Sequence, residues 1–308
     1  MVSRAFKSAR AEQAHTATHM IAMKAAVAQQ GGRVFMAFVF EEAALGLTVE
    51  GLCVTGEMKD RSKNRIVRSL SFSVDEGERL AIVGRSGCGK TMTAMAILGL
   101  LPDNCSMTGS IRLDGAELVG LRPARRRALL GRDMVLLPQS GADFLNPSLT
   151  IRRQMAECLK RNGVPRAARE ERMESLLGAL GFSDPGRVLR SYPFQLSGGM
   201  AQRVVMAMAS AGAPRLVIAD EPTKGVDREN VQLFLESLGR VFSGAAVLLI
   251  THDISVAAAS DRLLVMRDGQ AEEYGETQEV LRHPQSVHTH ELICSLPHAL
   301  SHVDRRLV

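Results

Sequence analysis

The most constraining feature of the sequence is a glycine-rich loop between an apolar strand and an apolar helix. Residues 84–91 read Gly-Arg-Ser-Gly-Cys-Gly-Lys-Thr and fit the pattern G-x-x-x-x-G-K-[ST]. Residues 79–84 form a short apolar run typical of a buried strand, and residues 91–101 carry apolar residues at helical spacing. In this context the glycines let backbone N–H groups converge at a helix N-terminus. An ordinary glycine turn is the alternative, but the complete pattern favours a site for the phosphates of a nucleoside triphosphate.

The predicted phosphate site has a clear division of roles. Lys90 is expected to reach the β- and γ-phosphates, and the Thr91 hydroxyl is expected to bind Mg²⁺. The nucleotide-binding residues are expected to be Gly84, Arg85, Ser86, Gly87, Cys88, Gly89, Lys90, Thr91 and Met92. Cys88 lies close to a helix N-terminus and two positions from Lys90, and both neighbours favour a thiolate. We therefore expect Cys88 to be the most reactive cysteine, the alternative being a small residue that merely fits.

Composition narrows the class of protein. The chain has 308 residues, is 45% hydrophobic and has no apolar run of the roughly 18 residues that a membrane span needs. Its five cysteines are scattered without metal-ligand spacing, which indicates a reducing, cytosolic location. The basic clusters at residues 122–127 and 152–153 are expected to be solvated helix faces rather than a nucleic-acid surface, because only 4% of residues are aromatic and none is Trp.

The order of predicted elements indicates an α/β fold. Residues 1–45, rich in Ala, Gln and Ser, are expected to be a poorly ordered N-terminal extension; a transit peptide or an upstream start codon are the alternatives. The predicted strands are residues 47–54, 69–74, 79–84, 109–115, 134–138, 215–220, 246–253 and 262–269. Residues 123–133, 150–163 and 165–182 have helical patterns. Strands separated by helices predict a largely parallel sheet with helices on both sides.

A second helix N-terminus carries an anion-binding pattern. Residues 196–203 read Leu-Ser-Gly-Gly-Met-Ala-Gln-Arg ahead of an apolar helix, where Ser197 is a good N-cap and two glycines expose backbone N–H groups. A capped tight turn is the alternative. Three strand ends add polar groups: Asp220 and Glu221 follow one apolar strand, His252 another and Gln139 a third. An Asp can hold Mg²⁺, and a Glu can polarise water for attack on a γ-phosphate.

In this order the segments resemble the ATP-binding cassette (ABC) ATPases, over roughly residues 47–297. The resemblance implies a P-loop NTPase fold with a RecA-like, mostly parallel core sheet, an antiparallel β subdomain and a helical signature subdomain at about residues 140–212. The ATPase domain would span residues 46–297 and a C-terminal tail residues 298–308. It further implies ATP and Mg²⁺ as ligands, with Thr91, Gln139 and Asp220 at the metal, and Glu221, His252 and Gln139 as catalytic residues. The signature would be Ser197, Gly198, Gly199 and Met200, with Met where Gln is more usual, and Asp227 would end the D-loop.

The family arrangement implies a shared active site. Two such chains face head to tail, so that the signature of one binds the nucleotide held by the other. One family feature is missing, because no aromatic residue lies near Thr55 and Gly56 to stack on adenine. Contact with adenine is therefore expected to be weak or to come from Val67 and its neighbours. The histidines His283, His288, His290, His298 and His302 suggest a metal site, but their spacing is poor for a helical ligand pair.

The sequence favours transport over the other functions of this family. A soluble ATPase of DNA repair or translation is the alternative, but the chain has one cassette and neither heptads nor cysteine pairs. Residues 136–151, 191–209 and 280–297 resemble the peptide, nickel and metal–opine importer group. The expected partners are a second, paralogous ABC ATPase, two permeases and a substrate-binding protein, with no nucleic acid, at the cytoplasmic face of the plasma membrane. The absence of a cysteine-containing extension slightly favours nickel or metallophore cargo.

Overall fold

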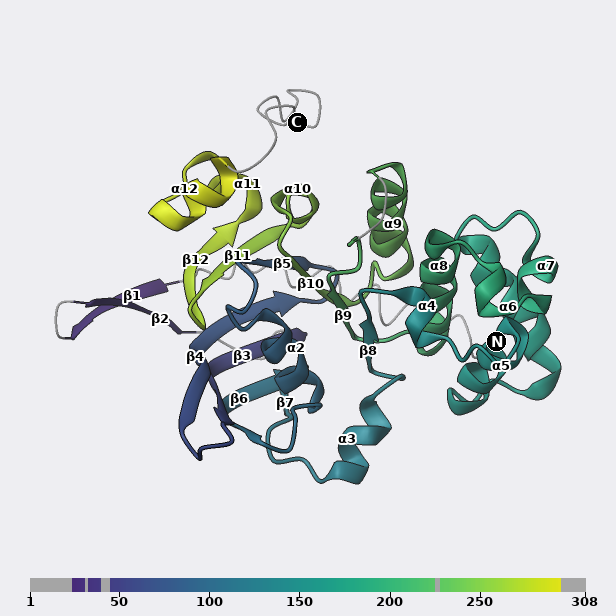
Figure 1. The fold of residues 1–308 in the computed structure, drawn as a ribbon, viewed down its shortest axis with the longest axis horizontal. Helices are drawn as coiled ribbons and strands as arrows, with labels where there is room; N and C mark the ends of the chain where they lie inside the picture. Colours follow the sequence, from purple (N-terminus) through teal and green to yellow (C-terminus); the bar gives the residue numbers. More distant parts are fainter. Residues whose placement is uncertain (1–23, 31–32, 40–44, 225–227, 295–308) are drawn as a thin grey trace, which may run out of the picture. The chain divides into compact units, whose positions relative to one another are not determined.

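The computed structural model describes residues 24–30, 33–39, 45–224 and 228–294 (Figure 1). The chain divides into two compact units, Met1–Ala43 and Ala44–Val308. In the first unit, β1 (Lys24–Gln30) and β2 (Arg33–Val39) form an antiparallel hairpin. The sequence pattern predicts no strand here, only a poorly ordered extension. The structure differs here from the prediction, and the reason is that the sequence of β2 is rich in β-branched and aromatic residues, which favour strands.

The larger sheet of the second unit carries the predicted parallel core. Its strands are β5 (Arg79–Val83), β8 (Met134–Leu137), β9 (Leu216–Asp220), β10 (Ala246–Thr251), β11 (Arg262–Arg267) and β12 (Gln270–Glu276). Their spatial order is β12-β11-β5-β10-β9-β8, and every neighbouring pair is parallel except β11 with β12. All six residues of β10 are buried, as expected for a strand covered on both faces. The prediction of a mostly parallel core sheet is therefore confirmed.

A second, antiparallel sheet has the order β4-β3-β6-β7. Its strands are β3 (Gly46–Glu57), β4 (Lys63–Asp75), β6 (Cys105–Leu113) and β7 (Ala116–Glu117). Leu70, Phe72 and Val74 are fully buried and alternate with more exposed positions, because successive side chains of a strand point to opposite faces. Helix α2 (Lys90–Leu98) contacts β3 and β4 from this sheet and β9 from the core sheet. The phosphate-loop helix therefore lies between the two sheets.

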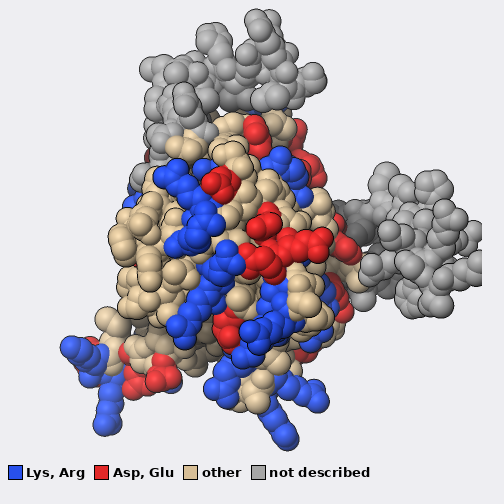
Figure 2. All heavy atoms as spheres, turned by 90° about the vertical axis from the view of Figure 1, so that its right-hand side faces the viewer, with Lys and Arg blue, Asp and Glu red and all other residues tan. Residues whose placement is uncertain are grey.

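Between β8 and β9 the regular elements are all helices. They are α4 (Gly141–Phe144), α5 (Ile151–Arg161), η1 (Arg166–Ala168), α6 (Arg169–Ala179), α7 (Pro185–Arg190), η2 (Pro193–Gln195), α8 (Gly198–Ala209) and η3 (Ser210–Gly212). Ile151, Met155 and Leu159 of α5 are buried at a spacing of four residues, which gives the helix one apolar face. Figure 2 shows basic and acidic side chains interspersed on this side of the molecule. Within the helical segment, Arg152 of α5 forms an ion pair with Glu170 of α6.

The remaining helices are α3 (Pro123–Leu129), α9 (Arg228–Val241), α10 (Ile254–Ala257), α11 (Thr277–Arg282) and α12 (Val287–Cys294). The sequence pattern predicts α3 and, without bounds, helices between the strands after Ser197, where α9 and α10 lie; it does not predict β12, α11 or α12. Helix α9 is amphipathic, with Phe234, Leu235 and Leu238 buried, so its helical periodicity is present in the sequence. None of the helices described is both long and apolar enough to cross a membrane.

The short helix α4 packs unusually closely against α8. A Cβ atom on Gly141 would lie 2.6 Å from the backbone nitrogen of Gln202 and 2.8 Å from the carbonyl carbon of Ala201. These are backbone atoms inside a helix, so they cannot move aside as the end of a side chain would. Glycine at residue 141 is therefore required for the contact that joins the segment after β8 to the start of α8.

We expect Gly141→Ala to lower the free energy of unfolding by about 1–3 kcal/mol, the usual scale for overpacking. Gly178→Ala is the matched control, because a Cβ on exposed Gly178 in α6 meets nothing within 4 Å. That control should stabilise the chain by about 0.5–1 kcal/mol, since alanine is the better helix former. Urea unfolding of both variants measures the difference, and equal stability of the two would show that the α4–α8 contact has been misjudged.

Candidate active site

The parallel register brings the predicted site residues to one edge of the core sheet. Val83 of β5 lies opposite Thr251 of β10, and Asp220 of β9 lies opposite Ile250. Leu137 of β8 lies opposite Ala219, which places Gln139 two residues further on, beyond the same edge. The phosphate loop, the acidic pair, His252 and Gln139 thus follow the carboxyl ends of four adjacent strands. This is where open α/β sheets bind their ligands.

The phosphate loop has the backbone that its glycines predict. Gly89 has φ +108° and directly precedes α2, which begins at Lys90. A Cβ on Gly84 would lie 2.2 Å from the carbonyl oxygen of Met266, so the loop passes directly over β11. The Lys90 ammonium is buried and donates to the carbonyl oxygens of Gly84 at 2.7 Å and Arg85 at 3.3 Å. The carbonyl groups of the loop therefore bind the Lys90 ammonium, which is the group predicted to bind the phosphates.

The Asp220 carboxylate is suited to a cation. Its Oδ1 atom is buried and has no hydrogen-bond partner among the described residues. Burial raises the pKa of the Asp220 carboxyl above its ordinary value and the Glu221 charge adds to the rise, whereas the nearby Thr91 hydroxyl and the Lys90 charge oppose it. A buried oxygen without a partner beside a hydroxyl is the kind of oxygen-only ligand set that Mg²⁺ prefers. The residues present therefore fit the predicted metal.

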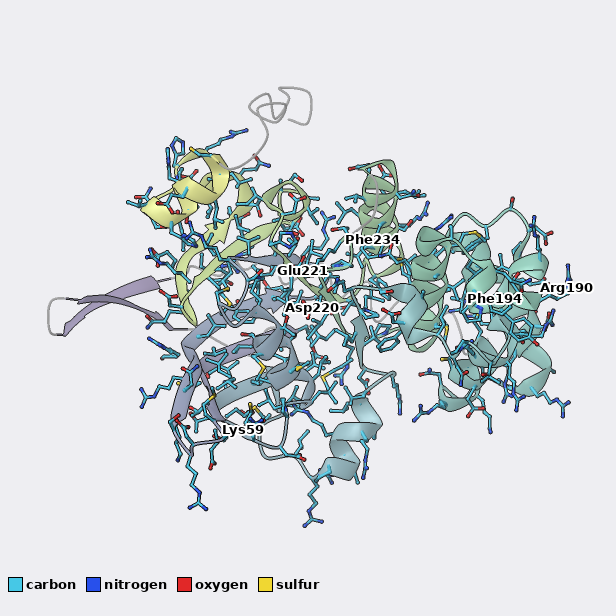
Figure 3. The ribbon with its side chains drawn as sticks, viewed as in Figure 1. Lys59, Arg190, Phe194, Asp220, Glu221 and Phe234 are labelled. Atoms are coloured by element: carbon cyan, nitrogen blue, oxygen red, sulfur yellow. The ribbon has the colours of Figure 1, made fainter. Side chains whose placement is uncertain are left out.

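Glu221 and His252 are in direct polar contact at this edge. The Nδ1 atom of His252 lies 2.7 Å from Oε2 of Glu221, and the Glu221 side chain is 18% exposed against 54% for His252. Glu221 has φ +50°, a conformation that is strained for a residue other than glycine, and its N–H donates to the Ile250 carbonyl at 2.8 Å. Figure 3 shows Asp220 and Glu221 as neighbours at the end of β9. The strained backbone turns the carboxylate towards the imidazole.

Gln139 is exposed beyond β8, the edge strand, so its amide is accessible from this edge of the sheet. Asp227, the predicted D-loop residue, lies outside the described residues.

The predicted signature segment begins a helix capped by Ser197, as expected. That helix, α8, belongs to the group of helices between β8 and β9. Ser197 caps α8 and its Oγ accepts from the Met200 N–H at 3.3 Å. A Cβ on Gly198 would meet nothing within 4 Å, and one on Gly199 would meet only the Asn230 side chain, so the helix end is open. Helix α8 contacts α4, α5, α6 and β8, whereas α2 contacts β3, β4 and β9. The two predicted anion sites of this chain therefore belong to separate packing regions.

Burial narrows two expectations from the sequence. Val67 is fully buried, with its side chain in the core, whereas its neighbour Ile66 is partly exposed, so of these two only Ile66 has side-chain surface to offer adenine. Cys88 is only 8% exposed. Burial raises the pKa of its thiol above the ordinary value, and the nearby Lys90 only partly opposes that rise. Cys88 is thus a small buried residue and not the reactive thiol expected; Cys294 is the exposed cysteine.

The histidine tail does not form a metal site among the described residues, which contain no group of three or more suitable side chains. His298 and His302 lie outside them. His288 is buried in α12 rather than presented to solvent.

The structure also reveals contacts that sequence reasoning missed. Arg85 in the phosphate loop pairs with Glu291 of α12 at 3.2 Å, across 206 residues of sequence. The Gln202 amide of α8 donates to the carbonyl oxygen of Pro222, the residue after Glu221. Arg126 is buried, although the basic cluster around it was predicted to be a solvated helix face; Arg122, Arg125 and Arg127 are exposed as predicted. Each of these contacts joins residues far apart in the sequence, so no local pattern around Arg85, Gln202 or Arg126 could have indicated it.

Comparison with known proteins agrees with this geometry. The family model described as ABC transporter matches residues 67–224. The chain is 36% identical over 251 residues to the metal-staphylopine import system ATP-binding protein CntD of Staphylococcus aureus, covering 80% of this chain and 92% of that protein. It is 39% identical over 241 residues to the dipeptide transport ATP-binding protein DppD of Haemophilus influenzae, covering 76% and 72%.

The fold is shared with solved structures. The dimeric structure of MJ0796, a bacterial ABC transporter cassette, superposes with a TM-score of 0.64 at 25% identity and covers 75% of this chain and 98% of that one. The antiparallel β sheet, the mostly parallel core and the helical segment confirm the predicted fold class. The chain belongs to the ABC transporter family, as an ATP-binding protein that hydrolyses ATP to drive transport.

Proposed function

We propose that this chain is the ATPase subunit of a bacterial importer for small solutes of the peptide, nickel or metal–opine class. It would act at the cytoplasmic face of the plasma membrane with separate permeases, a substrate-binding protein and a second, paralogous ATPase. The observation that carries the catalytic assignment is the 2.7 Å contact between Glu221 and His252 beside the phosphate loop. The cargo class rests on similarity to the import proteins named above.

The residues at the sheet edge have complementary tasks in hydrolysis. The Lys90 ammonium, now held by loop carbonyls, would exchange these for phosphate oxygens when ATP enters. Thr91, Asp220 and Gln139 would hold Mg²⁺, which neutralises phosphate charge when bound. Glu221 would accept a proton from the attacking water, and His252 would orient the Glu221 carboxylate through their hydrogen bond.

The separation of the two anion sites supports a shared active site. In Figure 3, Phe194, which lies three residues before Ser197, is among the helices of the α4–η3 segment, away from Asp220 and Glu221. An open, capped helix N-terminus without a phosphate of its own is suited to bind the γ-phosphate held by a second chain. Ser197, Gly198, Gly199 and Met200 would therefore complete the partner's site, and the partner's signature would complete this one.

Glu221→Gln is expected to keep ATP binding while turnover falls about a hundredfold or more, the usual scale for loss of a general base. Phosphate release and ATP binding by the assembled transporter are the measurements. Glu279→Gln in α11 is the control, because Glu279 is exposed and distant in sequence from every predicted site residue. Turnover near the wild-type rate would remove Glu221 from this role.

Ser197→Arg should leave ATP binding by the isolated chain unchanged and block hydrolysis by the assembled pair. The added side chain would fill the open end of α8 and put a charge where the partner's phosphate is expected. Ser183→Arg, at an exposed position before α7, should leave both measurements unchanged. Loss of nucleotide binding by the isolated Ser197→Arg chain would contradict the head-to-tail arrangement.

By the family resemblance, the segment 144–147 after Gln139 would lie near the groove that receives a coupling helix of the permease, so Phe144→Ala tests coupling. The Phe144 side chain is 58% exposed at the end of α4, so its removal costs little buried area. We expect uptake by the assembled transporter to fall while ATP hydrolysis and the melting temperature of the isolated chain change little. Leu233→Ala removes another exposed apolar side chain, on α9, and should leave uptake intact. A large loss of thermal stability in Phe144→Ala would instead identify plain packing.

A further inference from the structure

One arginine of the basic cluster at residues 122–127 is unlike its neighbours. Arg126 of α3 is 7% exposed, and its guanidinium donates only to main-chain carbonyl oxygens. Nε donates to Leu98 at 3.2 Å, Nη2 to Ala96 at 2.9 Å and to Ile97 at 2.6 Å, and Nη1 to Leu118. Among the described residues no carboxylate lies at ion-pairing distance from it. Main-chain carbonyl oxygens therefore surround the positive charge, and the charge of Glu117 adds a longer-range attraction that partly opposes the effect of burial.

Three of the four acceptors are the last carbonyls of α2. Residues Ala96, Ile97 and Leu98 end the helix, where the final carbonyls carry the negative end of the helix dipole; the Gly99 N–H also donates to the Ala96 carbonyl. Within α2 itself the last turn contains no basic residue. Arg126 therefore supplies from another element the cation that a helix C-terminus favours, and the planar guanidinium can bind several carbonyls at once.

The fit around this guanidinium is tight. A Cβ on Gly99, which ends α2 with φ +69°, would lie 2.3 Å from the Nε atom of Arg126. The guanidinium therefore packs directly against the residue that ends α2, with no room for a side chain between them. Because α2 has nine residues, its two ends are about 13 Å apart at 1.5 Å per residue. A short helix of this kind moves as a rigid body, so fixing its last turn also fixes its first.

We propose that Arg126 is a positioning residue for nucleotide binding, because it fixes the carboxyl end of the helix whose first residues are Lys90 and Thr91. The inference rests on the proposed roles of those two residues. Arg126 also belongs to α3, which leads through β8 to Gln139. One side chain thus ties the helix of the phosphate loop to the segment that carries the predicted glutamine of the active site.

The test compares arginines of the same cluster in the full 308-residue chain. Isothermal titration with MgATP, well below the melting temperature of each variant, gives the dissociation constant. Arg126→Met should raise it about tenfold, because a small displacement of the helix misplaces the groups that hold phosphate. Arg125→Met and Arg127→Met remove the same charge from exposed neighbouring positions and should leave it unchanged. Arg126→Lys should give an intermediate dissociation constant, because lysine keeps the positive charge but lacks the planar guanidinium that binds several carbonyls at once.

The outcomes separate a positioning role from simple stabilisation. If Arg126→Met melts at a lower temperature but binds MgATP as tightly as the wild type, the proposal is overturned. An equal loss of affinity in all three methionine variants would also overturn it, because only the net charge would then matter. If Arg126→Met does not fold, Arg126→Lys decides: weaker binding supports the proposal and wild-type binding refutes it. Lys90→Ala tests the proposed phosphate site itself. If that variant binds MgATP as tightly as the wild type, the proposed role of Lys90 is wrong, independently of Arg126.

Discussion

The parallel pairing of β5, β10, β9 and β8 is the constraint on which the rest of the site depends. Parallel strands end at a common edge, and the register sets Val83 opposite Thr251 and Asp220 opposite Ile250. Groups separated by more than a hundred residues in sequence therefore meet without any loop reaching across the sheet. A shift of one strand by one residue would turn its buried side chains to the other face of the sheet. The packing of the apolar core therefore fixes the register that also aligns the site residues.

Several polar groups at this edge are satisfied by arrangements that a nucleotide would replace. The Lys90 ammonium is bound by carbonyls of its own loop, and the Glu221 carboxylate by His252. The Asp220 Oδ1 atom has no partner among the described residues, although an unpaired buried oxygen is costly. Such groups gain most from a ligand that supplies phosphate oxygens and a cation. The fold thus keeps its binding groups in place at some expense in stability.

Much of the fold and the site was predictable because the information is local. The glycine loop, the capped helix at Ser197 and the polar residues after apolar strands are all defined within a few positions of sequence. Burial and long-range pairing were not predictable in this way. Nothing in the run of arginines distinguishes Arg126 from Arg125, and nothing near Cys88 indicates that burial outweighs the charge of Lys90. The Arg85–Glu291 pair joins residues from almost opposite ends of the cassette.

The start of α8 is packed against both segments of its own chain that carry proposed catalytic residues. Gly141, two residues after Gln139, touches the backbone of Ala201 and Gln202. Gln202 in turn donates to the carbonyl oxygen of Pro222, which follows the strained Glu221. Close-packed backbone cannot deform gradually, so a shift of α8 must move or break these contacts together. If the open end of α8 binds phosphate on a second chain, the same contacts provide a direct route from that event to the Glu221 and Gln139 segments of this one.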